Sequence, residues 1–281
     1  MITRRTFHQA ALGALAAPAL LAKPNSVVNG VQIGAQSYSF RDRPLDEAIK
    51  AMAEVGLSEC ELYQGHVEPK EKGAALVEWR KTVSLDHFKD VRKKFDGAGI
   101  TLYAYNYSLK DSATDEEFER GFQMVRAMGI NRLTASSTVT GAARYDKFAP
   151  KYGVYCGMHN HSNMKDNEFN TPESFAKALE GRSKYIMINL DIGHFTAAGF
   201  DPVEYLQQHH DKIITLHIKD RKKDQGDNVV FGEGDTAIKP VLQLLKKNKW
   251  KIPANIEYEY KGADPVADVK KCYEYCRAAL A

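Results

Sequence analysis

The stretch Asn189-Leu190-Asp191-Ile192-Gly193-His194 closes a predicted strand with a carboxylate and places an imidazole three residues later. Three other predicted strands end in the same way, in imidazole or carboxylate groups that bind divalent metals. Their final segments are Met158-His159-Asn160-His161, Leu216-His217-Ile218-Lys219-Asp220 and Asn255-Ile256-Glu257-Tyr258-Glu259. The carboxyl ends of successive parallel strands in a barrel converge on one region, where such barrels keep their active sites. The four segments therefore predict a metal site at the mouth of a barrel.

Strand-like and helix-like stretches alternate eight times along the chain. Several strands are continuous apolar or β-branched runs, as expected for parallel strands covered by helices. We predict strands at residues 31–36, 58–63, 100–105, 132–135, 154–159, 185–191, 213–218 and 252–258. We predict helices at residues 45–55, 86–97, 115–128, 142–151, 171–179, 202–210, 238–248 and 265–279. Eight such units on this length predict an α/β fold, the (β/α)8 or TIM barrel.

Residues 1–22 have the pattern of an export signal. They begin with the paired arginines of Thr3-Arg4-Arg5-Thr6-Phe7 and continue into an apolar run that ends in Leu20-Leu21-Ala22. This order is typical of export signals, and the arginine pair indicates the twin-arginine route. A short membrane anchor is the alternative, but the run contains Pro18 and is shorter than the ~20 apolar residues of a spanning helix. We therefore expect a periplasmic or otherwise exported protein whose mature chain, residues 23–281, is a single domain.

Charge and cysteine content exclude several classes of protein. The chain has 39 Lys and Arg residues against 36 Asp and Glu residues; without Arg4 and Arg5 the balance is 37 against 36, a net charge of +1. This gives no electrostatic reason to expect a nucleic-acid partner, and no later apolar run is long enough to span a membrane. The four cysteines have no disulfide or zinc spacing and are predicted to be buried free thiols. The sequence leaves the oligomeric state open and allows a homo-oligomer.

The parity of the strands predicts which side chains share the site. Alternate residues of a strand point the same way, and His159, Asp191, His217 and Glu257 each stand at or near the end of a face that is otherwise small or polar. A buried carboxylate without a partner is costly, and a divalent cation removes that cost. Two carboxylates with imidazoles suit Mn, Zn, Co, Fe or Mg better than Ca. A single histidine here would more simply be a hydrogen-bonded core residue, but four consecutive strand ends favour a metal.

These segments resemble the xylose isomerase-like barrels, a family that includes sugar epimerases, hydroxypyruvate isomerases, inosose dehydratases and endonuclease IV enzymes. The resemblance covers essentially the whole mature chain and is most specific at residues 190–194, 216–220 and 256–259; Cys60-Glu61-Leu62-Tyr63 and Gly232-Glu233-Gly234-Asp235 also look like family segments. It implies that Asp191, His217 and Glu257 bind metal, and that His194 lies beside the metal and touches substrate.

The fifth strand departs from the family pattern. Epimerases of this family usually carry a glutamate there that binds metal and exchanges a proton, whereas this chain has His159 followed by Asn160 and His161. An imidazole can ligate a metal, and a neutral one can act as a base near pH 7. The symmetric two-carboxylate proton exchange of a ketose 3-epimerase therefore loses one member. The sequence leaves open whether His159 or His161 is the fourth metal ligand.

Other polar residues fall near the ends of the first three strands or in the later loops. Candidates for holding sugar hydroxyls are Gln36, Tyr38, Glu61, Tyr63, Tyr105 and Asn106, with surface or packing roles as the alternative. Lys219 is expected either to neutralise an enolate beside the metal or to be a solvated lysine. The glycines of residues 231–235 suggest a phosphate loop only weakly, because the Lys and Ser or Thr of a P-loop are missing; ordinary loop glycines are the simpler interpretation.

We therefore predict an exported, divalent-metal-dependent sugar or keto-sugar isomerase or epimerase that works through a metal-stabilised enediolate. Glu257, or His159 or His161 in its place, would remove the proton next to the carbonyl, His194 would orient or protonate the oxygen, and Lys219 would assist. The alternative is a dehydratase or lyase on the same site, acting for example on inososes or 3-keto-glycosides. A non-catalytic carbohydrate-binding barrel is a remote alternative, and a DNA-repair endonuclease conflicts with the charge balance. No Arg or Lys cluster marks a phosphate pocket.

Overall fold

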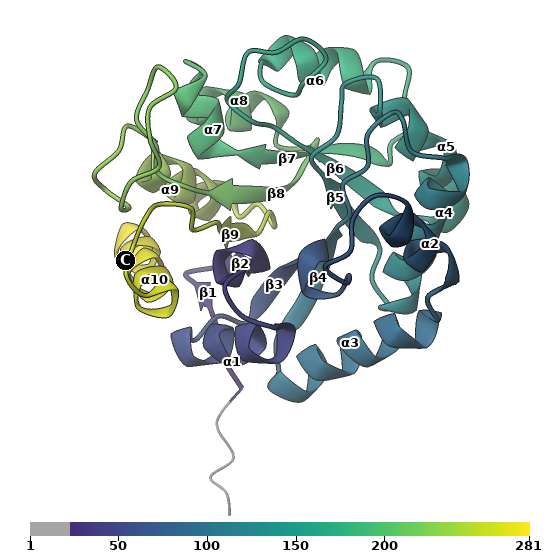
Figure 1. Ribbon diagram of the computed structural model, residues 1–281. Coiled ribbons are helices and arrows are strands. Elements are labelled where there is room, and N and C mark those ends of the chain that lie inside the picture. Colours follow the sequence, from purple (N-terminus) through teal and green to yellow (C-terminus); the bar gives the residue numbers. More distant parts are fainter. Residues whose placement is uncertain (1–22) are drawn as a thin grey trace, which may run out of the picture.

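The computed structural model describes residues 23–281, and the predicted export signal at residues 1–22 lies outside them. Eight parallel strands, each hydrogen-bonded to its neighbour in sequence, close into a barrel through the pairing of β2 with β9 (Figure 1). The strands are β2 (Val31–Gln36), β3 (Glu59–Tyr63), β4 (Thr101–Asn106), β5 (Arg132–Ala135), β6 (Tyr155–His159), β7 (Ile186–Asp191), β8 (Ile213–Ile218) and β9 (Ala254–Ile256). A short strand, β1 (Val27–Val28), pairs antiparallel with β2. The predicted TIM barrel is confirmed.

Helices surround the barrel (Figure 1). They are α1 (Leu45–Val55), α2 (Ala74–Thr82), α3 (Leu85–Ala98), α4 (Asp115–Ala127), α5 (Ala142–Tyr152), α6 (Pro172–Leu179), α7 (Ile192–Ala197), α8 (Pro202–His209), α9 (Ile238–Asn248) and α10 (Pro265–Leu280). Two short 3-10 helices follow strands, η1 (Ser37–Phe40) after β2 and η2 (Gln64–His66) after β3. Among the described residues, no helix is long and apolar enough to cross a membrane.

The helix starts follow the capping chemistry of the sequence. Thr114 and Glu117 form a capping box at the start of α4: each side chain accepts a hydrogen bond from the backbone N–H of the other residue. Asp201 accepts from two backbone N–H groups at the start of α8, just before Pro202. The eight predicted helices are all present within a few residues of their expected bounds, which is the usual uncertainty at helix ends.

Two helices were not predicted. The helix α2 buries only one residue, Arg80, so it has no apolar stripe for a sequence pattern to reveal. The helix α7 begins directly after β7, and Asp191 caps it by accepting from the backbone N–H of His194. This cap fixes the backbone that carries both residues, so α7 contributes to the geometry of the site. The four cysteines are buried and free, as predicted.

Candidate metal centre

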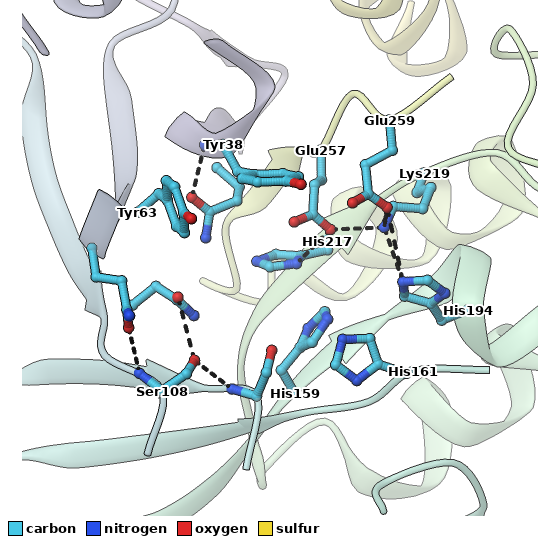
Figure 2. A pocket seen from close by; sticks show the side chains of 14 residues that line it. Tyr38, Tyr63, Ser108, His159, His161, His194, His217, Lys219, Glu257 and Glu259 are labelled. Atoms are coloured by element: carbon cyan, nitrogen blue, oxygen red, sulfur yellow. Dashed lines mark hydrogen bonds and ion pairs between the residues drawn. The ribbon is translucent and has the colours of Figure 1, made fainter. Parts of the chain in front are cut away.

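The carboxyl ends of the strands surround a polar pocket of about 330 Å³ (Figure 2). Its walls come from loops and strand ends on every side of the barrel mouth. The lining residues are Gln36, Tyr38, Tyr63, Gln64, Asn106, Ser108, Ser136, His159, His161, His194, His217, Lys219, Glu257 and Glu259. The pocket therefore lies at the end of the barrel where TIM-barrel enzymes keep their chemistry.

Four side chains meet at the base of this pocket. His159, Asp191, His217 and Glu257 each offer one donor atom, and these atoms all lie within 4.8 Å of one another. All four side chains are buried; among the described residues His159 Nδ1 has no hydrogen-bond partner, and Asp191 Oδ2 has no hydrogen bond but forms an ion pair with Lys219 at 3.1 Å. Unpartnered buried polar atoms are uncommon in folded proteins and ask for a missing partner. Two imidazoles and two carboxylates in this arrangement fit a first-row divalent metal.

The orientation of His217 is set by carboxylates on both sides. Its Nε2 lies 3.0 Å from Oε1 of Glu61, and its Nδ1 lies 3.1 Å from Oε2 of Glu257. Burial opposes charging of the ring, but Glu61 and Glu257 together raise the pKa of His217 well above its usual value. Glu61 is itself fixed by Gln36 at 2.8 Å and Thr134 at 2.7 Å. A carboxylate that holds the far nitrogen of an imidazole is the usual support for a metal-binding histidine.

Lys219 is buried among carboxylates, so the interpretation as a solvated lysine is wrong. Its side chain is 2% exposed, and its Nζ lies 2.5 Å from Glu259 Oε2, 2.9 Å from Glu257 Oε2 and 3.1 Å from Asp191 Oδ2 (Figure 2). Burial lowers the pKa of Lys219, but the three carboxylates more than offset this and raise it above its usual value. Three carboxylates therefore surround this one ammonium group. A buried excess of negative charge favours a further cation.

The two carboxylates in the donor group respond differently to this environment. Burial raises the pKa of Asp191 to about 6, against the opposing pull of Lys219. Burial also acts on Glu257, but Lys219 and His217 overcome it and hold the pKa of Glu257 well below its usual range. Glu257 is therefore the more firmly ionised of the pair.

Three imidazoles line the side of the pocket nearest β6 and β7. The ring centroids of His159 and His161 lie 4.9 Å apart, and those of His161 and His194 lie 5.3 Å apart. Burial, aided by the positive charge of Lys219, lowers the pKa of both His161 and His194. Burial likewise lowers the pKa of His159. These rings are neutral near pH 7, and a donor atom from each of the three also lies within 4.8 Å of the others.

The predicted substrate contacts divide into two groups. Gln36, Tyr38, Tyr63 and Asn106 line the pocket. Glu61 and Tyr105 do not line it; both are fully buried, because Glu61 lies behind His217 and Tyr105 stacks on Tyr107 with ring centroids 5.8 Å apart. The structure therefore argues against direct substrate contact by these two side chains.

Sequence reasoning missed three lining residues, Gln64, Ser108 and Ser136. Each follows a predicted strand by one to three residues, so a wider search of the strand ends would have found them. Ser108 connects the others: its backbone N–H donates to Gln64 Oε1 at 2.7 Å, and its Oγ accepts from the backbone N–H of Ser136 at 2.9 Å. This network gives the pocket a wall of neutral hydrogen-bonding groups.

The glycine-containing loop at residues 231–235 is not a phosphate loop. The Asp220 carboxylate accepts from the backbone N–H of Gly232 at 2.7 Å, of Gly234 at 3.0 Å and of Thr236 at 3.2 Å. The donors that would hold a phosphate are therefore occupied by a side chain of the same protein. A Cβ at Gly234 would lie 1.9 Å from Asp220 Oδ1, which explains the glycine at this position.

A family model described as "Xylose isomerase-like TIM barrel" matches residues 49–279. The chain belongs to this family. An inosose dehydratase from Mesomycoplasma hyopneumoniae is 24% identical over 291 residues, which cover 85% of this chain and 90% of that protein. The L-ribulose-5-phosphate 3-epimerase UlaE of Escherichia coli is 30% identical over 124 residues, 42% of this chain and 43% of that protein. These relatives are enzymes of the dehydratase and epimerase kinds.

Solved structures share the fold at lower sequence identity. The IOLI protein with a bound zinc atom has a TM-score of 0.68 and 18% identity, covering 88% of this chain and 97% of that one. The 3-keto-D-glucoside 4-epimerase YcjR from E. coli also has a TM-score of 0.68, with 12% identity over 88% of this chain and 99% of that one. The family resemblance drawn from the sequence is therefore confirmed.

Proposed function

We propose that the protein is a divalent-metal-dependent isomerase or epimerase of a sugar or keto-sugar. The observation that carries the proposal is the buried group of His159, Asp191, His217 and Glu257 at the base of a polar pocket. His159 belongs to this group and His161 does not, so we assign the fourth ligand position to His159. A divalent cation held there would supply Lewis-acid stabilisation of negative charge on a substrate oxygen.

The side chains of the pocket can move a proton on opposite sides of a bound sugar. Glu257 and His161 project toward the pocket from opposite sides, from β9 and from the end of β6 (Figure 2). Glu257 is ionised and can accept the proton next to the carbonyl, while His161, once it has taken a proton from solvent, can return one from the other side. This glutamate–histidine pair would replace the two carboxylates expected of family epimerases. Lys219 would balance the negative charge that develops next to it.

The charge of the pocket favours a substrate without phosphate. Lys219 is the only Lys or Arg among the lining residues, and its ammonium group is committed to three carboxylates. Glu257 and Glu259 add negative charge to the walls. A phosphate group would find no free cationic side chain among the described lining residues, whereas the neutral wall of Gln64, Ser108 and Asn106 suits sugar hydroxyls.

Elimination is the second candidate, and a specific observation favours it. His159 and His161 lie at the strand end where family epimerases have a carboxylate, and an inosose dehydratase relative matches over 85% of this chain. The base that abstracts the proton next to the carbonyl would then pass it to the departing β-hydroxyl or glycosidic oxygen, to which His194 is placed to donate a hydrogen bond. The product would be a dehydrated or deglycosylated sugar.

Solvent labelling separates the outcomes. Metal-loaded protein is incubated in deuterated water with unphosphorylated keto-sugars, inososes and 3-keto-glycosides. Deuterium in an intact sugar supports isomerisation or epimerisation, and loss of water or of the aglycone supports elimination. No exchange and no elimination with any of these compounds would contradict the proposal. The variant His161→Asn should slow exchange by about 10²–10⁴-fold, while Glu233→Gln on the exposed loop should not.

We further propose that the protein is exported by the twin-arginine route. The support is the sequence of residues 1–22 alone, with Arg4 and Arg5 followed by an apolar run. Replacing both arginines with lysine keeps the charge and removes the recognised pair, so the protein should stay in the cytoplasmic fraction. Equal export of both forms would contradict this proposal.

A further inference from the structure

The imidazole of His194 lies between two cationic side chains. Nη1 of Arg221 lies 2.7 Å from His194 Nδ1, and Nζ of Lys219 lies 3.1 Å from His194 Nε2 (the second contact is visible in Figure 2). A neutral imidazole carries one N–H and one acceptor nitrogen. The two contacts therefore cannot be equivalent, and their chemistry decides which nitrogen holds the proton.

The contact with Arg221 determines the protonation of Nδ1. A guanidinium group has five N–H donors, has no acceptor and does not lose its charge in proteins. The 2.7 Å contact with Arg221 therefore requires Nδ1 to accept, and a neutral ring then carries its proton on Nε2.

Lys219 is a second donor, and it faces Nε2 of His194. An ammonium group has three N–H donors, and three carboxylate oxygens, from Asp191, Glu257 and Glu259, lie within 3.1 Å of Lys219 Nζ. Lys219 Nζ also lies 3.1 Å from His194 Nε2, but its contacts with Glu259 at 2.5 Å and Glu257 at 2.9 Å are shorter, so the ammonium group has closer acceptors than this nitrogen. The nearest carboxylate oxygens to Nε2 are at 3.9 Å and 4.0 Å, too far for a hydrogen bond. The N–H at Nε2 thus has no acceptor among the described residues, and His194 lines the pocket.

Arg221 is held in place by the loop that follows β8. Its Nε and Nη2 donate to the carbonyl oxygen of Gly226 at 3.0 and 2.6 Å, and its Nη1 also donates to Ser162 Oγ at 2.7 Å. The residue is 9% exposed. The guanidinium is therefore fixed by the β8–α9 loop and the β6–α6 loop before it reaches His194.

We propose that Arg221 is a positioning residue that locks neutral His194 in the tautomer with its proton on Nε2. In this tautomer His194 donates a hydrogen bond to a substrate oxygen and does not act as a base. It also has no free nitrogen to bind metal, since Nδ1 accepts from Arg221 and Nε2 is protonated. Two groups of side chains bring their donor atoms close enough to bind a metal. The group of His159, His161 and His194 is excluded as a metal site by this tautomer. The group of His159, Asp191, His217 and Glu257 remains.

The tautomer can be read directly by nuclear magnetic resonance. The full-length, metal-free protein is labelled with ¹⁵N-histidine and ¹⁵N-arginine, and the His194 ring is assigned from its absence in His194→Asn. We expect Nδ1 to have the shift of an unprotonated ring nitrogen, Nε2 to have that of an N–H, and a coupling across the hydrogen bond from Arg221 to Nδ1. A proton on Nδ1 in the wild-type protein would overturn the proposal. This reading needs neither metal nor turnover, so its failure is distinct from failure of the proposed function.

Variants test whether Arg221 is the cause. Arg221→Met should give a mixture of tautomers or a proton on Nδ1, whereas Ser162→Ala, which removes the other partner of the same Nη1, should leave Nε2 protonated. An unchanged tautomer in folded Arg221→Met protein would overturn the assigned role. If that variant does not fold, the wild-type coupling between Arg221 and Nδ1 decides the question, and its absence counts against the proposal. In Co²⁺ titrations, His159→Asn should lose about 10-fold or more in affinity, and His194→Asn should not.

Discussion

Glu61 contacts no solvent, yet its carboxylate decides which nitrogen of His217 faces the pocket. With Nε2 of His217 held 3.0 Å from Glu61, the other ring nitrogen, Nδ1, faces Glu257 at 3.1 Å. Because Glu61 does not line the pocket, any effect of changing it on metal binding must act through His217.

Glu61→Gln should therefore weaken metal binding without removing a ligand. The amide keeps nearly the same shape but loses the charge that supports the imidazole, and loss of such a partner typically costs about 10–100-fold in metal affinity. Isothermal titration with Zn²⁺ or Co²⁺ measures the change, with Glu233→Gln on the exposed loop as the matched control. Equal affinities in Glu61→Gln and wild-type protein would show that His217 does not need this support.

Strand parity was sufficient to bring the four candidate ligands together, because alternate side chains of a strand share a face. Parity could not identify the partners of those ligands. His217 and Glu61 are separated by 156 residues along the chain, and the three carboxylates around Lys219 come from two other strand ends. Such pairings depend on barrel closure. The sequence therefore left the role of Lys219 open, and it predicted Glu61 as a substrate contact although Glu61 supports His217 from outside the pocket.

The loop after β8 is organised by a buried carboxylate at its base. Asp220 accepts three backbone N–H groups from residues 232–236, and Arg221, the next residue, donates to the carbonyl of Gly226. The loop therefore wraps around two consecutive side chains that extend from the end of β8, and its conformation is coupled to the site through Arg221 and His194.

Gly234→Ala should destabilise this loop. The new Cβ would lie 1.9 Å from Asp220 Oδ1, so either the loop or the carboxylate must move, at a cost of about 1–3 kcal/mol. Gly97→Ala is the matched control, because Gly97 lies exposed in α3 and its new Cβ would meet nothing within 4 Å; it should stabilise the protein by up to about 1 kcal/mol. Chemical denaturation of both variants provides the comparison. A Gly234→Ala protein as stable as wild type would refute the close contact.

Secondary structure was predictable where the helices had apolar faces and capping residues, as in α4 and α8. It was not predictable at α2, whose one buried side chain is that of Arg80, or at α7, which Asp191 caps immediately after the strand. Both helices depend on tertiary contacts that a sequence pattern does not reveal. For α2 the contact is the ion pair of Arg80 with Glu68 at 2.7 Å. For α7 it is the closure of the barrel.

A buried carboxylate also lies at the other end of the barrel, away from the pocket. Glu59 begins β3 at the opposite end of the strands, is 7% exposed, and has an Oε1 atom without a hydrogen-bond partner among residues 23–281. Burial raises the pKa of Glu59 to about 8, against the opposing effect of Arg132. The folded protein therefore prefers Glu59 protonated, whereas the unfolded chain ionises it near its ordinary value.

The sign of the resulting pH dependence follows from linkage. A carboxyl whose folded pKa is raised contributes stability below its unfolded pKa of 4.5, and that stability is lost as the pH rises toward 8. Within this window the loss is at most about 1.4 kcal/mol per pH unit. Glu59→Gln removes the ionisation, so its unfolding free energy relative to wild type should increase from pH 4.5 to pH 8. Glu54→Gln, at an exposed position of α1, serves as the control. A constant difference across this range would mean that Glu59 is not protonated in the folded state.

Metal content is the most direct test of the central claim, which is that one cation is shared by side chains from four adjacent strands. Folded protein, stripped with chelator and reloaded, should bind one Mn²⁺, Co²⁺ or Zn²⁺ per chain by titration and elemental analysis. Asp191→Ala should abolish this binding, because it removes one of the two carboxylates of the donor group. Folded wild-type protein that binds none of these ions, or an Asp191→Ala variant that binds them equally well, would contradict the account.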